Sequence, residues 1–141
     1  MTLLSNEQKV KLHRLYNQRR FSELELEIEI ISDAKTRSAF LSNLLGVAKL
    51  RKKDNDENKD WLGAKNSFLD SYQKDPSYID ALCNYAHLSV KLRDYEVAYT
   101  KLMDQKKRGY NPKINEALAR IYFFEGHFYR TTIPLFLYLI L

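Results

Sequence analysis

The stretch Tyr85–Leu102, with the sequence YAHLSVKLRDYEVAYTKL, contains the pattern that decides the fold. A large aromatic residue is followed by a small one, Ala86, and nine residues later Tyr95 begins a second motif. In that motif Ala98 lies three positions and Leu102 seven positions after the aromatic residue. Spacings of three and four place side chains on one face of a helix. The stretch therefore predicts two helices joined by a short turn, packed closely where their small residues meet.

The same two motifs recur along the chain. The aromatic motif occurs as Phe21 with Leu24, Trp61 with Ala64, Tyr95 with Ala98 and Phe128 with Thr131, at steps of 40, 34 and 33 residues. The small-residue motif occurs at Leu12, Gly46, Ala86 and Ala119, at steps of 34, 40 and 33. Both series contain one step of 40, which assigns six extra residues to a loop insertion in the polar stretch 52–60. A period near 34 predicts four helical pairs that stack to share one core.

Local signals indicate where the helices begin and end. Ser5, with Gln8 three positions later, has the form of a capping box. A proline at position 76 ends one helix, and Asn111 caps the helix that starts at Pro112. Gly109 and Gly126 mark turns. The sequence thus predicts eight helices, at about 5–18, 21–33, 36–52, 60–74, 78–91, 94–108, 112–125 and 128–141.

These motifs resemble the tetratricopeptide repeat (TPR). The resemblance is carried by Leu45-Gly46…Trp61-x-x-Ala64-x-x-x-Phe68…Asp75-Pro76, by Tyr85-Ala86…Tyr95-x-x-Ala98-x-x-x-Leu102, and by Leu118-Ala119-x-x-Tyr122…Gly126-x-Phe128. It covers nearly the whole chain. Departures are Leu24 and Thr131, where the family prefers alanine, and Tyr110, where it prefers a closing proline. The resemblance implies an all-α, right-handed α-α superhelix in a single domain of residues 1–141, with repeats at about 5–38, 39–78, 79–111 and 112–141.

Two sets of residues follow from this prediction. The residues expected to pack the repeats together are Leu12, Phe21, Gly46, Trp61, Ala64, Ala86, Tyr95, Ala98, Ala119 and Phe128. In the family the first helix of each pair lines the concave face, which implies a groove for a partner. The residues expected there are Lys9, His13, Asn43, Arg51, Asn84, His87, Lys91, Lys113, Arg120 and Phe124. Asparagine, cations and aromatic rings suit an extended peptide held through its backbone and acidic groups.

Charge and composition restrict the function further. The net charge of +5 comes from 23 basic and 18 acidic residues, and basic and acidic helix faces alternate, whereas nucleic-acid binders more often show one continuous basic stripe. His13, His87 and His127 lie in different repeats without metal-ligand spacing, and Cys83 is the only cysteine. No catalytic constellation is present. We therefore expect a non-enzymatic, cytoplasmic protein-interaction module with no cofactor, no metal and no membrane segment, bound to a protein or peptide with acidic groups.

Two alternatives remain open at this stage. The apolar stretch 128–141 lacks the polar face of a capping helix, which favours a further repeat, self-association or a longer protein. The organisation loosely resembles TPR arrays that precede bacterial sulfotransferase or glycosyltransferase domains, so the chain can be the front segment of such an enzyme. The run 102–112 resembles the end of a pentatricopeptide repeat, a class that binds single-stranded RNA, but only this junction matches.

Overall fold

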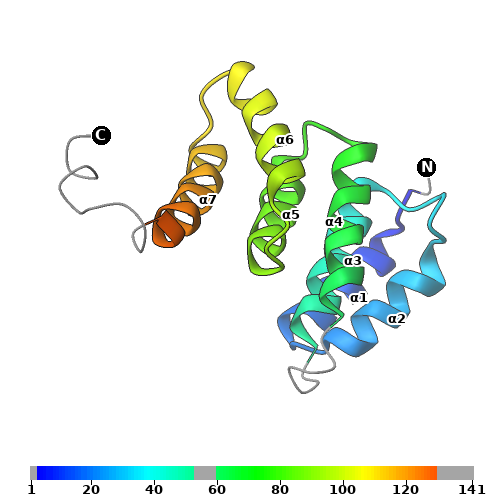
Figure 1. Ribbon diagram of the computed structural model, residues 1–141. Helices are drawn as coiled ribbons and strands as arrows, with labels where there is room; N and C mark the ends of the chain where they lie inside the picture. The colour runs from blue at the N-terminus through cyan, green and yellow to red at the C-terminus, as the bar shows by residue number, and fades with distance from the viewer. Residues whose placement is uncertain (1–2, 53–59, 130–141) are drawn as a thin grey trace. The chain divides into compact units, whose positions relative to one another are not determined.

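The computed structural model describes residues 3–52 and 60–129, and every secondary-structure element in that part is a helix (Figure 1). Seven helices are found there: α1 (Asn6–Asn17), α2 (Phe21–Ile31), α3 (Ala39–Arg51), α4 (Trp61–Lys74), α5 (Ile79–Lys91), α6 (Glu96–Lys107) and α7 (Pro112–Tyr129). The predicted all-helical class is confirmed for these residues, and the first seven predicted helices start within three residues of the observed ones. Within the same residues, no helix is long and apolar enough to cross a membrane.

Several helix ends form as their sequence signals predict. Ser5 accepts a hydrogen bond from the Gln8 amide at 3.2 Å, and the Gln8 side chain accepts one from the Ser5 amide at 2.9 Å, which completes the capping box. Asp75, directly before the proline, ends α4. The Asn111 side chain accepts a hydrogen bond from the amide of Lys113 at 2.9 Å and caps α7.

Two predictions near the end of α7 are wrong: no turn lies at Gly126, and no new helix begins at position 128. Helix α7 continues through Gly126 to Tyr129, so positions 128 and 129 belong to α7. A glycine inside a helix costs only about 1 kcal/mol relative to alanine, which a well-packed helix tolerates. Gly126 is itself buried, so the position suits a residue without a side chain. Residues 130–141, most of the predicted last helix, lie outside the described residues.

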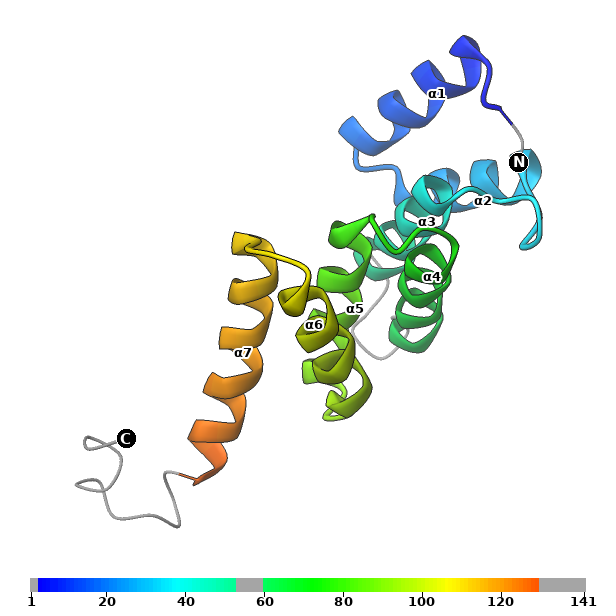
Figure 2. The same cartoon turned by 90° about the horizontal axis from the view of Figure 1, so that it is seen from above.

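The chain divides into two compact units, Met1–Ala81 and Leu82–Leu141, and we describe each separately. In the first unit, consecutive helices of α1–α4 pack on one another, and α3 and α4 lie side by side in both views (Figures 1 and 2). The Ser71 hydroxyl, near the end of α4, donates to the carbonyl of Ala39 at the start of α3 at 2.6 Å, so these two helices are antiparallel. The core beneath α1–α3 consists of Leu12, Leu15, Phe21, Leu24, Ile28, Leu41, Leu45 and Ala48.

At Gly46, helix α4 packs closely on the backbone of α3. A Cβ atom built on Gly46 would lie 2.5 Å from Cε1 and 2.7 Å from Cδ1 of Phe68, shorter than any real Cβ contact. The Phe68 ring is 1 % exposed, and Ala64, one turn earlier on α4, is completely buried. The small residue therefore lets an aromatic ring pack directly on the backbone of α3, as the sequence pattern predicts.

Ion pairs join helices of the first unit across faces of opposite charge. The Lys11 ammonium on α1 lies 2.6 Å from the carboxylate of Glu27 on α2, and Lys52 pairs with Glu25. The alternation of basic and acidic stretches at the N-terminal end thus corresponds to paired helix surfaces. Such partly exposed pairs favour the observed helix pairing but add little to stability.

In the second unit, α6 and α7 pack antiparallel through aromatic side chains. Tyr95, at the start of α6, meets Phe124 near the end of α7 edge to face, with ring centroids 5.6 Å apart. Tyr99 and Tyr122 form a similar pair at 6.1 Å. Such pairs contribute about 1 kcal/mol each beyond the area they bury. Tyr95, the aromatic residue at the start of α6, therefore packs against the next helix along the chain.

The turns after α1 and α5 have the same geometry, 74 residues apart. Arg19 and Arg93 both adopt the left-handed conformation, each with φ of 56°. The amide of Arg93 donates to the carbonyl of Val90, and the amide of Asp94 donates to that of Ser89. Equivalent bonds run from Arg19 and the residue after it, so both turns are Schellman motifs with arginine at C′. The aromatic series also separates Phe21 from Tyr95 by 74 residues, so local structure repeats with the sequence.

The ten predicted packing residues are not all inside the molecule. Leu12, Phe21, Gly46, Ala64, Ala86 and Ala98 are buried, and Trp61 and Tyr95 are half-buried. Ala119, in contrast, is exposed on α7. The helix that Ala119 was expected to pack against would be formed mainly by residues 130–141, outside the described part, and the Phe128 side chain is likewise not described.

Candidate functional site

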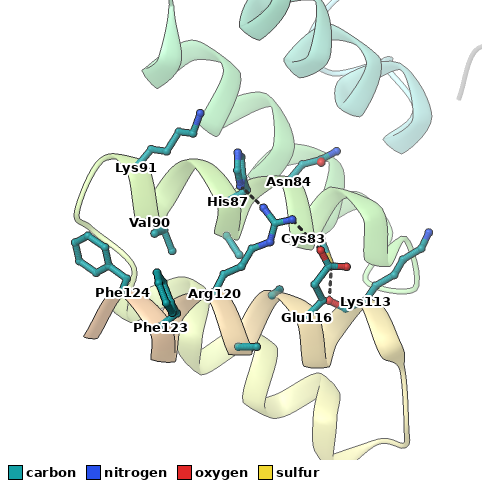
Figure 3. A pocket seen from close by; sticks show the side chains of 13 residues that line it. Cys83, Asn84, His87, Val90, Lys91, Lys113, Glu116, Arg120, Phe123 and Phe124 are labelled. Atoms are coloured by element: carbon teal, nitrogen blue, oxygen red, sulfur yellow. Dashed lines mark hydrogen bonds and ion pairs between the residues drawn. The ribbon is translucent and has the colours of Figure 1, made fainter. Parts of the chain in front are cut away.

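Helices α5 and α7 of the second unit enclose an open groove of about 970 Å³ (Figure 3). The side chains that line it come from both helices, with Phe123, Phe124 and Lys91 toward one end and Lys113 and Glu116 toward the other. The lining residues are Cys83, Asn84, Ala86, His87, Val90 and Lys91 from α5, and Lys113, Glu116, Ala117, Ala119, Arg120, Phe123 and Phe124 from α7. Grooves of this size accommodate peptide or small-molecule ligands.

Two contacts fix how α5 and α7 run beside each other. The Cys83 thiol donates to the carbonyl of Lys113 at 3.6 Å. One turn further along α5 and about two turns further along α7, Arg120 Nη1 lies 3.1 Å from His87 Nδ1. Residue numbers rise together on the two helices, so α5 and α7 are parallel. Their exposed side chains therefore form matching rows along the groove.

Arg120 occupies the middle of the groove and joins both walls. Its Nη2 donates to Glu116 Oε1 at 2.8 Å, one turn earlier on α7, and its Nη1 contacts His87 on α5. A guanidinium group can only donate, so His87 Nδ1 must accept and the imidazole carries its proton on Nε2. Burial in the groove, followed by the positive charges of Lys91 and Arg120, holds the pKa of His87 below its usual value.

Apolar side chains form the other end of the groove. Phe123 is 73 % exposed, although it is a large aromatic residue in the middle of a helix. Val90 lies opposite, and Phe124 is partly covered through its contact with Tyr95. The groove thus places an exposed aromatic ring beside a charged guanidinium, with Lys91 at the same end as the two phenylalanines (Figure 3).

The structure brings together six of the ten predicted groove residues, all in the second unit: Asn84, His87, Lys91, Lys113, Arg120 and Phe124. The other four lie in the first unit. Lys9 and His13 belong to a shallow depression whose lining comes from α1 and the residue after it, with Asn17 donating or accepting at the His13 ring at 3.1 Å.

The remaining two predicted groove residues contact tyrosines of the first unit. Arg51 donates to the hydroxyl of Tyr16 at 3.3 Å and lies 5.9 Å from its ring centroid. Asn43 donates to the hydroxyl of Tyr78 at 3.3 Å. The first contact joins α3 to α1, and the second joins α3 to the turn that precedes α5, so both side chains have partners within the first unit.

Val90 and Phe123 line the groove but were missed by the sequence analysis. Each lies three positions after a predicted groove residue, His87 and Arg120 respectively, and so on the same helix face. Both side chains are apolar, but their helical spacing alone places them beside the predicted groove residues.

The described residues contain no group of three or more His, Cys, Asp or Glu side chains that could hold a metal ion. Comparison with protein-family models, with curated proteins and with solved structures gives no match. The class of protein that can be stated is therefore an all-helical one built from packed, consecutive helices. The resemblance to tetratricopeptide repeats stays a prediction.

Proposed function

We propose that this chain is a protein-interaction module of the tetratricopeptide type, and that its second unit holds an extended segment of a partner between α5 and α7. The observation that carries the proposal is Phe123, which is 73 % exposed within a groove of about 970 Å³ next to the charged Arg120. A concave surface with apolar walls and a few convergent polar groups is the default candidate for a binding site.

The length of the groove suits a short stretch of extended chain. From Lys113 to Phe124 the α7 wall covers eleven residue steps, or about 16 Å at 1.5 Å per residue. An extended peptide rises about 3.3 Å per residue, so roughly five of its residues span this distance. Side-chain amides such as Asn84 are the groups that hold a peptide backbone in such a groove. The proposal applies equally to a free-standing chain and to the front segment of a longer protein.

Single-stranded RNA is the competing ligand, because cations and aromatic rings also bind nucleotides. Glu116 argues against it. Its carboxylate lies in the groove beside Arg120, where it would repel a phosphate backbone. The groove also offers only three cationic side chains, Lys91, Lys113 and Arg120, against this one carboxylate.

A selection experiment with the full chain tests the proposal. A phage library of random dodecapeptides is panned against the immobilised protein, and enriched peptides are tested on Phe123→Ser, which removes the exposed ring, and on Tyr110→Ser. Tyr110 is 85 % exposed but lies outside the groove, so it is a matched control. We expect enriched peptides to lose binding to Phe123→Ser and to keep it for Tyr110→Ser.

Two results would contradict the proposal. One is equal binding of the selected peptides to both variants, since the site would then lie elsewhere. The other is no enrichment of any peptide together with salt-dependent binding of an oligo(U) strand, which would support the RNA alternative.

A further inference from the structure

We infer that the groove between α5 and α7 selects an internal peptide segment in which an acidic side chain and a bulky apolar side chain lie two positions apart. This inference rests on the proposed function and names the class of sequence that the groove accepts. Arg120 and Phe123 would each contact one of the two side chains.

The charge of the groove favours one carboxylate. Three cationic side chains, Lys91, Lys113 and Arg120, and one carboxylate, Glu116, are among the residues that line it. Glu116 already shows where a carboxylate binds, because one of its oxygens lies 2.8 Å from Arg120 Nη2. A second carboxylate can join or displace Glu116 at the guanidinium, which offers five N–H donors.

The spacing of Arg120 and the two phenylalanines sets the distance between the ligand side chains. Phe123 and Phe124 lie three and four residues after Arg120, which corresponds to about 4.5–6 Å along the helix axis. In an extended chain, side chains two positions apart point to the same side and lie about 6.6 Å apart. Neighbouring side chains point to opposite sides. A carboxylate at Arg120 therefore places the side chain two positions away, and not the adjacent one, over the rings.

Four matched peptides test the inference. The reference is Gly-Ser-Ser-Glu-Ser-Leu-Ser-Ser-Gly, acetylated and amidated so that no terminal charge contributes. One variant has Gln for Glu, a second has Ser for Leu, and a third has Glu and Leu adjacent. Isothermal titration calorimetry on the full chain measures each affinity. We expect the reference peptide to bind, and each variant to bind about tenfold more weakly.

Protein variants show whether the two ligand side chains meet the residues assigned to them. Arg120→Gln should weaken the reference peptide about tenfold but leave the Gln peptide within about twofold. Phe123→Ser should weaken the reference peptide about tenfold but leave the peptide with Ser for Leu within about twofold. Arg108→Gln and Tyr110→Ser remove an exposed side chain of the same type outside the groove, and they should change nothing.

Each opposing result overturns the inference in a recognisable way. If the Gln and Glu peptides bind equally and Phe123→Ser weakens both, the groove binds peptides without selecting charge, and the proposed function stands alone. If the adjacent Glu-Leu peptide binds as well as the reference, the spacing is wrong. If the reference peptide does not bind, the ligand is not such a segment. If the parent chain is a dimer in sedimentation equilibrium and Phe123→Ser dissociates it, the occupant of the groove is a second copy of the chain.

Discussion

Substitution of Gly46 by alanine tests the packing of α3 on α4. The added Cβ would meet three carbon atoms of the Phe68 ring at 2.5, 2.7 and 2.9 Å, and the ring is 1 % exposed, so it has no free space in which to move. Overpacking of this kind costs about 1–3 kcal/mol. Alanine regains about 1 kcal/mol in helix propensity. Because the ring is buried, we expect the packing cost to dominate, with a net loss of up to about 2 kcal/mol.

Urea unfolding of the full chain, followed by circular dichroism at 222 nm, measures this loss. Phe68→Leu supplies the control, because leucine lacks the outer ring atoms Cε1 and Cζ that the new methyl group would meet. In the Phe68→Leu background, Gly46→Ala should cost little or become stabilising, so that the double-mutant cycle gives a coupling of about 1 kcal/mol or more. A Gly46→Ala protein at least as stable as the parent, or a cycle without coupling, would refute the close approach of the two helices.

Three further predictions concern other parts of the molecule. Arg93→Gly should stabilise the chain by about 0.5–1 kcal/mol in urea unfolding, because glycine adopts the left-handed conformation without steric cost, whereas Arg108→Gly, at a helix end with negative φ, should give no gain. Ser5→Ala should cost about 1 kcal/mol in the same assay through loss of the capping box, and an unchanged midpoint would contradict that cap. An NMR titration should give a His87 pKa below its usual 6.5. The folded chain then binds this proton less readily than the unfolded one, so the free energy of unfolding falls as the pH drops below 6.5 and levels off below the folded pKa.

Helix ends and close packing could be predicted from the sequence because they depend on local chemistry. Ser5 with Gln8 and Asn111 before a proline satisfy amides in their own first turn, so neighbouring residues suffice to define them. Gly46 was identified because a small residue recurs at the repeat spacing. Whether a helix ends at Gly126 could not be predicted in this way, because glycine ends some helices and lies within others. The packing of the whole helix determines which of the two occurs.

The groove could be predicted only in part, for a tertiary reason. Helical spacing identified which side chains of α5 and α7 share a face, and it therefore found Arg120 and His87. Arg51 and Asn43 have equivalent positions on α3, but they contact the hydroxyls of Tyr16 on α1 and of Tyr78 in the turn before α5. Periodicity within one helix does not contain that information. The apolar side chains of the groove recur at the same helical spacing as buried core residues. The sequence alone therefore does not distinguish a binding surface from a core face.

The most direct test of the central claim is an NMR titration of the ¹⁵N-labelled full chain with the Glu-Ser-Leu reference peptide. Binding between α5 and α7 predicts amide shift changes concentrated at the positions that line the groove, including His87, Arg120 and Phe123, with α1–α4 unaffected. Changes centred on α1–α4, or no changes at millimolar peptide, would contradict a peptide-binding groove in the second unit.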